Sequence, residues 1–284
     1  MCVAKVDDGI IWHYTDDNGL RGILEKGTLW LTDIFSLNDP SELRHGIDIS
    51  LKVLKNVTDT KNNYVCIYES VKEIFSKGIR DQKFFFVCSF SKDSDDLGQW
   101  RAYANNGEGY ALGFSTNILT TGFNCAFHGK DYYPDSFDVT YDDKKLYEIM
   151  TKELDKIIQN ISKNIVDSTK ENARTIVYEL VYKIMENAFR FKHPAYSNEN
   201  EYRFLMIQNA NADKEKINTR FRKDTIIPYI EYSWINCASE ALMEIKIGPA
   251  ASEKKSKKFI DDCLKMYRPE KHIESKISDI PYRR

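Results

Sequence analysis

A long stretch with helical periodicity, set between segments that resemble β-strands, most limits the folds open to this chain. Within residues 142–191, apolar side chains recur every three or four positions, which is typical of helices that bury one face. These side chains are Leu146, Ile149, Met150, Leu154, Ile157, Ile158 and Ile161, followed by Val177, Leu180, Val181, Ile184 and Met185. A turn near residues 167–170 would divide the stretch into two antiparallel helices. We therefore expect an α+β protein of one domain, 1–284, with a helical insertion at about 142–191.

The segments on either side of this stretch are rich in β-branched and aromatic residues, and several of them alternate between apolar and polar positions. The clearest is KFFFVCSFS at residues 83–91, a short apolar run bounded by polar residues, which predicts a buried strand. Further strands are expected at residues 10–15, 28–33, 110–115, 201–207, 228–235 and 241–249, with an edge strand within 272–284. Shorter helices are expected at residues 18–27, 42–57, 61–79, 97–104 and 252–267. The pattern as a whole predicts a sheet with flanking helices.

The composition argues against two classes of protein. Hydrophobic residues make up 42% of the chain and aromatic residues 13%, and side chains of this kind bury enough area to offset chain entropy, so we expect no disordered protein. A broad nucleic-acid-binding surface is usually basic, whereas this chain has a net charge of -2 and a pI of about 6.3. A local basic cleft is still compatible with this balance.

Several familiar sites and signals are missing from the sequence. The six cysteines are scattered without a CxxC pair, so we expect reduced thiols and no metal site built from them. The motifs GxGxxG, HExxH and GxSxG do not occur, nor does a phosphate-binding P-loop. The first residues lack the apolar core of a secretory signal, and no run approaches the roughly 20 apolar residues of a membrane helix. We therefore expect a cytoplasmic protein with no membrane partner.

The first expected strand ends in three side chains that can form hydrogen bonds. A histidine at position 13 can bind a ribose hydroxyl, and Tyr14 and Thr15 can line the same pocket. The alternative is that His13 is a partly buried strand residue whose ring is satisfied by a backbone carbonyl. A single histidine does not decide between these interpretations.

Two serines share one face of the expected strand at 83–91. Successive side chains of a strand alternate, so Ser89 and Ser91 point to one side and Phe90 to the other. Hydroxyl groups on an otherwise apolar strand need partners. The two serines can contact a ligand, or they can cap the turn that follows at SKDSDD.

Charged residues begin the expected strand at 201–207. Alternation would place Glu199, Glu201 and Arg203 on one face, at the mouth of a cleft. A carboxylate there can hold a ribose hydroxyl and stabilise positive charge that develops at the anomeric carbon. The alternative is a solvated strand end in which a carboxylate pairs with Arg203 and contributes little to stability.

Two further segments contain candidate binding residues. In the short helix QWRAYA, Trp100 and Tyr103 are three positions apart, a spacing that indicates core packing more often than a stacking platform, and Arg101 can meet a phosphate. Asn38-Asp39-Pro40 with Glu42 predicts a turn and a helix cap, or else the wall of a site.

Taken together, these motifs resemble a bacterial domain family of unknown function. The motifs are HYT at 13–15, NDP-E at 38–42, the strand at 85–91, W-x-x-Y-A at 100–104, E-x-E-x-R at 199–203 and P-Y-R at 281–283. They occur in the same order as in that family and extend over nearly the whole chain. The opening WHYTDDNGLRGILEKGTLWLTD also resembles the first strand and helix of ADP-ribosyltransferases, especially toxin-like enzymes that modify DNA or RNA.

The resemblance implies a mixed β-sheet split around a cleft for NAD, with roles for particular residues. His13 would contact the nicotinamide-side ribose, Ser89 and Ser91 would form the middle-strand element, Glu201 would be the catalytic glutamate, and Glu199 would orient the acceptor. Tyr14, Thr15, Trp100, Arg101 and Tyr103 would complete the NAD-binding residues, and Tyr14, Tyr103 and Tyr110 are candidates for a stacking tyrosine. The middle strand reads SFS in place of the usual STS. The helical insertion lies outside the minimal fold.

The leading hypothesis is thus an NAD-dependent ADP-ribosyltransferase, a toxin or phage-defence effector that modifies nucleic acid or protein. An antitoxin or another regulatory protein would be a natural partner. A second hypothesis is a non-catalytic nucleotide-binding sensor that signals through the helical insertion. The third is a metal-dependent nuclease that uses His13, Asp39, Glu42 and Glu201, although the spacing of these ligands is irregular.

Overall fold

The computed structural model describes residues 9–37, 41–59, 65–77, 83–129, 131–164, 170–209 and 216–282. The expected turn at residues 38–40, with Asp39, lies outside the described residues, as do the turn at 165–169 and Arg283. The chain divides into two compact units. We call residues 1–36, 84–138 and 198–284 the sheet unit, and residues 37–83 and 139–197 the helical unit.

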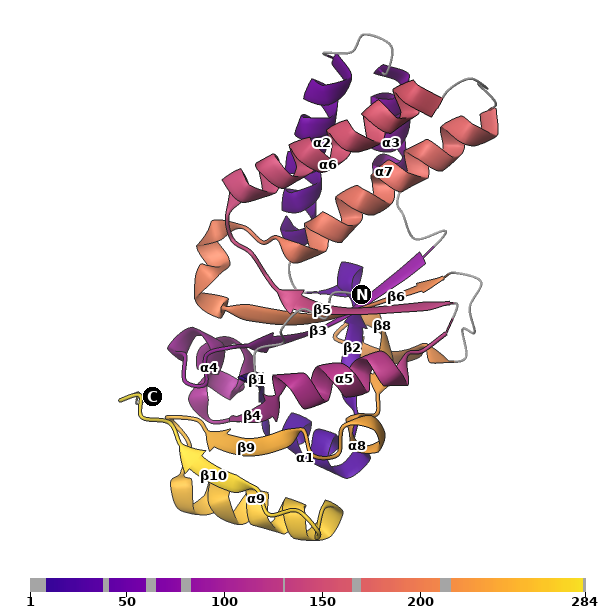
Figure 1. The fold of residues 1–284 in the computed structure, drawn as a ribbon. Helices are drawn as coiled ribbons and strands as arrows, with labels where there is room; N and C mark the ends of the chain where they lie inside the picture. Colours follow the sequence, from indigo (N-terminus) through magenta and orange to yellow (C-terminus); the bar gives the residue numbers. More distant parts are fainter. Residues whose placement is uncertain are drawn as a thin grey trace. The chain divides into compact units, whose positions relative to one another are not determined.

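A mixed, open β-sheet forms the framework of the sheet unit (Figure 1). Its strands, within the described ranges, are β1 (Ile10–Thr15), β2 (Leu29–Asp33), β3 (Lys83–Ser91), β4 (Tyr110–Ser115), β5 (Tyr132–Asp138), β6 (Glu201–Asn209), β7 (Asn218–Arg222), β8 (Thr225–Tyr232), β9 (Leu242–Ile247) and β10 (Glu274–Ile277). Their order is β10-β9-β4-β1-β3-β2-β8-β7. Strand β10 runs parallel to β9, whereas β1 and β4 are antiparallel, so the expected mixed sheet is confirmed.

Strand β3 is the branch point of the sheet. It pairs with β1, where Trp12 lies opposite Ser91, and with β2, where Thr32 lies opposite Val87. It also pairs with β6, which in turn pairs with β5. One strand therefore brings segments from three distant parts of the sequence into contact.

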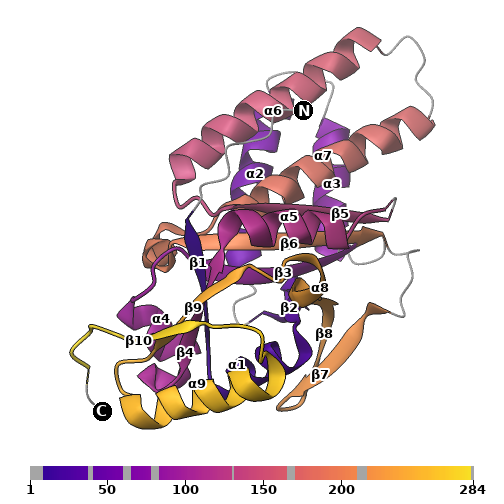
Figure 2. The same cartoon turned by 60° about the horizontal axis from the view of Figure 1, so that its bottom comes forward.

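The face of β3 that carries Phe86, Cys88 and Phe90 belongs to the main hydrophobic core. Four helices cover this core: α1 (Asp17–Lys26), α5 (Thr116–Ala126), α8 (Trp234–Cys237) and α9 (Glu253–Tyr267) (Figure 2). Helix α1 begins at the Asp16 cap, whose carboxylate accepts a hydrogen bond from the backbone of Gly19, and ends at Gly27 with φ of 64°. The local signals that predicted this helix from the sequence are therefore present in its structure.

A short helix, α4 (Leu97–Tyr103), packs against β1 with a smaller apolar cluster. The cluster contains Trp12 and Tyr14 of β1 together with Trp100 of α4. Because Trp12 and Tyr14 alternate with Ile11, which lies in the main core, the cluster covers the other side of β1.

The helical unit has a core of its own. It contains α2 (Ser41–Asp59), α3 (Val65–Lys77), α6 (Asp143–Asn164) and α7 (Lys170–Arg190). Buried Val53 and Leu54 of α2 join Leu146 of α6 and Leu180 of α7 in one cluster. The helices expected at 142–191 are thus present, and they share a core with two helices from residues 37–83. None of the helices in the described residues is long and apolar enough to cross a membrane.

Several elements of the described ranges differ from the sequence prediction. Helices α5 and α8 and strands β5 and β7 were not predicted, and the strand expected at 228–235 ends at Tyr232, before α8. Strand β5 contains Pro134, and β7 has four polar residues in five, so neither has the apolar alternation that identifies a strand.

Candidate functional site

The centre of the candidate site is a buried ion pair at the start of β6 that also binds a serine of β3. The hydroxyl of Ser89 donates a 2.6 Å hydrogen bond to Glu201 Oε1. Arg203 donates from Nε to Glu201 Oε1 at 2.7 Å and from Nη2 to Glu201 Oε2 at 2.9 Å. Both charged side chains are only 4% exposed. These three donors favour an ionised carboxylate in a fixed orientation.

This arrangement shows that the alternative interpretation, a solvated strand end, is wrong. The Glu201–Arg203 pair was considered from the sequence as an exposed pair of little energetic value, but it is buried, and a buried pair costs desolvation energy that only good geometry repays. The pair therefore forms a rigid polar group inside the sheet unit, and Ser89, which is exposed, links it to the surface.

His13 approaches Ser89 from another direction. Its Nδ1 lies 3.3 Å from the carbonyl oxygen of Ser89, and because a carbonyl only accepts, Nδ1 carries the proton. The imidazole also contacts Phe90, with ring centroids 5.4 Å apart. Burial lowers the pKa of His13 from 6.5, against an opposing effect of the hydrogen bond to Ser89. A neutral ring with Nε2 as an acceptor is the result.

The alternative interpretation gave His13 a backbone carbonyl as its partner, and the structure contains such a carbonyl. That carbonyl belongs to Ser89, whose hydroxyl binds Glu201. His13 shares the Phe90 side of β3, whereas the Ser89 hydroxyl leaves from the opposite side. The structure thus brings His13, Ser89 and Glu201 together around one residue, without a direct contact between His13 and Glu201 among the hydrogen bonds of the described residues.

Ser91 has a different role from Ser89, although the two side chains share one face of β3. It is buried, and its hydroxyl donates to the carbonyl of Glu199 at 2.8 Å and accepts from the backbone of Asp93 at 3.1 Å. This is the turn-capping alternative that the sequence allowed. Ser91 therefore fixes the loop after β3, while Ser89 contacts the ion pair.

The expectation that Glu199 alternates with Glu201 on one strand face is wrong. Glu199 is the last residue of the 3-10 helix η3 (Pro194–Glu199), and Asn200 adopts a φ of 44°, so the strand begins only at Glu201. The carbonyl of Asn200 accepts a 2.9 Å bond from the backbone of Lys92, and its side chain donates to Asp93. Asn200 was not singled out from the sequence; asparagine tolerates the left-handed region, which is the only signal for this bend.

The hydroxyl of Tyr14 is used within the protein. It donates to the carbonyl of Asp93 at 2.7 Å and accepts from the backbone of Asp96 at 3.2 Å, and burial raises its pKa. Tyr14 thereby holds the loop between β3 and α4. Thr15, the last residue of β1, is partly exposed and lies opposite Tyr110 of β4. Tyr110 is itself buried in the main core.

The expectation that Trp100 and Tyr103 pack into the core from one helix face holds for Trp100 alone. Trp100 is fully buried, lies edge-on against Tyr14 at 4.8 Å and donates its indole N–H to Asp95 at 2.7 Å. Tyr103, at the end of the helix, is 47% exposed, and Arg101 is also exposed. The helix has seven residues, or about two turns, and Tyr103 is the last of them, at the end of the helix.

No group of three or more metal-ligating side chains is found within the described ranges. Of the four ligands considered for a nuclease, Asp39 lies outside these ranges and the side chain of Glu42 is not described. His13 and Glu201 belong to the sheet unit, whereas Glu42 lies in the helical unit.

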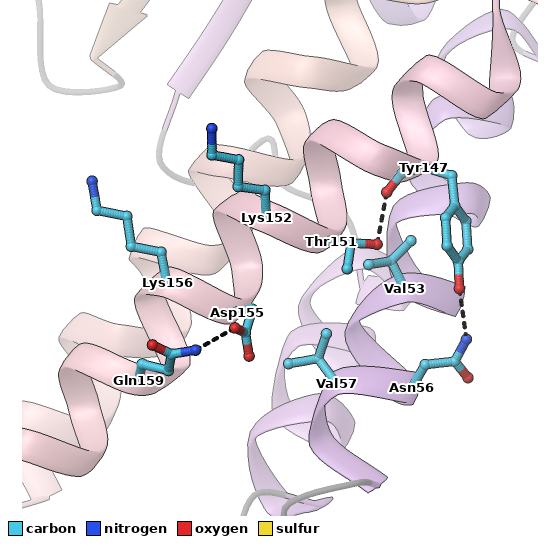
Figure 3. A pocket seen from close by; sticks show the side chains of 9 residues that line it. All are labelled: Val53, Asn56, Val57, Tyr147, Thr151, Lys152, Asp155, Lys156 and Gln159. Carbon is cyan, nitrogen blue, oxygen red and sulfur yellow. Dashed lines mark hydrogen bonds between the residues drawn. The ribbon is translucent and has the colours of Figure 1, made fainter.

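A groove of about 580 Å³ lies on the helical unit, between α2 and α6 (Figure 3). Its lining residues are Val53, Asn56, Val57, Tyr147, Thr151, Lys152, Asp155, Lys156 and Gln159. Asn56 donates to the Tyr147 hydroxyl at 3.1 Å across the groove. None of the residues selected from the sequence lines it.

Comparison with protein families gives a match over part of this chain. A family model described as a protein of unknown function (DUF2971) matches residues 99–204. The matched segment contains Trp100, Glu201 and Arg203, but neither His13 nor Ser89. No curated protein and no solved structure matches the chain.

Proposed function

We propose that the protein is an NAD-dependent ADP-ribosyltransferase whose site is centred on Ser89, Glu201 and His13. The observation that carries the proposal is the 2.6 Å hydrogen bond between Ser89 and Glu201, with His13 bound to the carbonyl of the same serine. The sequence resemblance assigned ribose, middle-strand and catalytic roles to these three residues, which come from three distant segments. The contact between Ser89 and Glu201 supports the roles of these two residues, and His13 reaches the same serine through its carbonyl, from the opposite side of β3.

The chemistry requires a fixed negative charge beside a reacting sugar. Transfer breaks the bond between nicotinamide and the ribose anomeric carbon, and nicotinamide leaves with the electron pair. An acceptor atom then bonds to that carbon and loses its proton. Positive charge develops on the sugar in between, and a carboxylate held ionised by Arg203 can stabilise it. Ser89 fixes the orientation of Glu201, and neutral His13 can exchange a hydrogen bond with a ribose hydroxyl.

The acceptor in this proposal is nucleic acid or protein. Such an enzyme would act as a cytoplasmic toxin or phage-defence effector, and a regulatory protein or antitoxin would restrain it. These parts of the proposal rest on the sequence resemblance.

The test is nicotinamide release from NAD by the purified full chain, with and without cell lysate or nucleic acid. Ser89→Ala is the informative variant, because Ser89 is exposed and its replacement leaves the Glu201–Arg203 pair in place. We expect wild type to release nicotinamide, and Ser89→Ala and Glu201→Gln to be at least about tenfold slower, as expected for lost transition-state interactions. Ser239→Ala, at another exposed serine, is the control. Equal release by Ser89→Ala and wild type would overturn the proposal.

A second candidate function follows from the same ion pair. Both oxygens of Glu201 are bound by Arg203 in a buried pair, which favours a structural carboxylate over a reactive one. A non-catalytic nucleotide sensor fits this observation. It predicts that NAD raises the melting temperature of the protein while no nicotinamide is released under any condition.

A further inference from the structure

Strand β7 forms one border of the sheet, and β8 and then β2 follow it toward β3 (Figure 2). Residues that lie opposite each other on neighbouring strands share a face of the sheet, as do residues two apart on one strand. Arg220 of β7 lies opposite Ile227 of β8, two residues before Tyr229. Tyr229 in turn lies opposite Thr32 of β2. Arg220 and Thr32 therefore belong to the same face.

This face continues to the candidate site on β3. Thr32 lies opposite Val87, and Ser89 is two residues further along β3, so the three side chains share the face. Diagonal neighbours such as Thr32 and Ser89 are roughly 7–8 Å apart. The hydroxyl of Ser89 donates to Glu201. The face thus connects the buried carboxylate of Glu201 to the strands on which Arg220 lies.

The side chain of Arg220 reaches inward across this face. Its guanidinium carbon lies 5.2 Å from the ring centroid of Trp30 in β2 and 6.0 Å from that of Tyr229 in β8. Its Nη2 donates to the hydroxyl of Thr32 at 3.1 Å. Two aromatic rings and one hydrogen bond therefore hold the guanidinium over β8 and β2, on the side of β7 that leads to Ser89.

No carboxylate pairs with Arg220 among the residues that the structure describes. Burial and the charge of Arg222 lower the pKa of Arg220. The opposing effects come from Tyr229 and Cys88, and neither of these is a carboxylate. Thr32 takes one of the five N–H donors of the guanidinium. A half-buried cation with unused donors is suited to bind an anion.

The thiol of Cys88 senses the charges at both ends of this face. Burial and the carboxylate of Glu201 raise its pKa, whereas Arg220 lowers it. Because the effect of a charge falls with distance, both groups lie near this part of β3. Glu201 is bound by Arg203 and not by Arg220. The carboxylate and the second cation are therefore separate groups that one ligand can contact.

Solvent reaches the face between these groups. Trp30 is 36% exposed, and Ser89 is also exposed. Two residues further along the register of Thr32 and Val87, these two side chains come to facing positions on β2 and β3. A ligand that enters here can contact Ser89 and the guanidinium beside Trp30 together.

We propose that Arg220 binds the diphosphate of a dinucleotide whose ribose lies beside Ser89 and Glu201. The identity of the dinucleotide, NAD, rests on the proposed function. A guanidinium matches two phosphate oxygens with parallel hydrogen bonds, and the nearby charge of Arg222 favours a doubly charged group over a singly charged one. One ribose and its methylene group separate the reacting carbon of NAD from the diphosphate, a length comparable with the step from Ser89 to Thr32.

The test measures binding, so it does not depend on turnover. ADP-ribose and adenosine, which lacks the diphosphate, are titrated into the full chain by calorimetry. We expect adenosine to bind at least about tenfold more weakly than ADP-ribose, and Arg220→Gln to weaken ADP-ribose by about tenfold without affecting adenosine. The diphosphate takes no part in bond breaking, so Arg220→Gln should raise KM for NAD in the nicotinamide assay and leave kcat nearly unchanged.

Two further variants separate binding from folding and from net charge. Arg220→Lys keeps the charge and most of the packing but loses the planar fork, so its affinity for ADP-ribose should lie between those of wild type and Arg220→Gln. The result then does not depend on how well Arg220→Gln folds. Arg21→Gln removes a positive charge from an exposed position of α1 in the same unit and should bind as wild type does.

Failure of this proposal can be distinguished from failure of the proposed function. Nicotinamide release together with equal ADP-ribose affinity in wild type and Arg220→Gln would overturn the role of Arg220 alone. ADP-ribose binding that depends on Arg220, without nicotinamide release, would support this role and overturn the transferase. No binding of ADP-ribose by wild type, an equal loss in Arg21→Gln, or Arg220-dependent binding of a single-stranded oligonucleotide in place of ADP-ribose would overturn the proposal.

Discussion

Arg203 donates hydrogen bonds to both carboxylate oxygens of Glu201, two positions before it on the same strand. Side chains two apart on a strand lie on one face, and this pair closes a bidentate contact within a single face of β6. The pair is buried, and the hydroxyl of Ser89 adds a third donor to the carboxylate. The stability of this part of the sheet and the proposed chemistry therefore depend on the same carboxylate.

Removal of one partner of this pair should strongly destabilise the protein. Arg203→Met leaves the charge of Glu201 buried without its main partner, and we expect a loss of about 3–5 kcal/mol in the free energy of unfolding. The double variant Glu201→Leu/Arg203→Met removes both charges and should recover much of this loss. Urea unfolding of the three proteins measures the difference. If Arg203→Met were as stable as wild type, the pair would be solvated in solution.

Acid should destabilise the protein through His13. Burial lowers the pKa of this histidine in the folded state below 6.5, so the folded chain resists protonation where the unfolded chain accepts it. The stability from neutral His13 is fully present above pH 6.5 and is lost as the pH falls from there through the folded pKa. His13→Gln should therefore lose less free energy of unfolding than wild type between pH 7.5 and 5.5. Parallel pH profiles for the two proteins would contradict this expectation.

Two helical glycines should respond oppositely to alanine. A Cβ at Gly46 of α2 would lie 2.8 Å from the Cα of Ala188 in α7, so Gly46→Ala forces backbone apart and should lower the melting temperature. A Cβ at Gly22 of α1 meets nothing within 4 Å. Gly22→Ala should therefore stabilise the protein by up to about 1 kcal/mol through helix propensity. Thermal unfolding of both variants tests the close approach of α2 and α7; stabilisation by both would show that the helices are further apart.

Loss of the Tyr14 hydroxyl should loosen the loop after β3. Tyr14→Phe removes the group that joins Asp93 and Asp96, and we expect a cost of about 1–3 kcal/mol because a buried backbone group loses its partner. Faster amide exchange at Asp96 would accompany the loss. Tyr267→Phe is the control, since its hydroxyl has no hydrogen bond among the described residues. Equal stability of the two variants would mean that water replaces the hydroxyl of Tyr14.

Local signals in the sequence predicted the elements that have strong periodicity or caps. The strand at 83–91 has the predicted bounds, and α1 begins and ends at the predicted cap and glycine. Strand β7 escaped prediction because an exposed edge strand needs no apolar alternation. The shared core of α2, α3, α6 and α7 also escaped, because periodicity shows that a helix has an apolar face but not which helix covers it.

The candidate site was predicted in part, for a similar reason. Alternation on a strand correctly placed Ser89 and Ser91 on one face, yet it could not show that Ser91 caps a turn while Ser89 binds Glu201. Alternation failed for Glu199, since the left-handed Asn200 separates it from the strand, which begins only at Glu201. Burial of the Glu201–Arg203 pair depends on neighbouring strands, which the local sequence does not specify.

The division of the helical unit into two chain segments has a consequence for how the protein is made. Helix α2 ends at Asp59 and its partner α7 begins at Lys170, so roughly 110 residues must be added before the two can meet. At about 5–20 residues per second, this takes the ribosome roughly 5 to 20 seconds. Throughout that interval Val53 and Leu54 lack α7, the last of the helices that later share their core. The nascent chain therefore presents an incompletely covered apolar helix to chaperones and proteases before translation has supplied the rest of its cover.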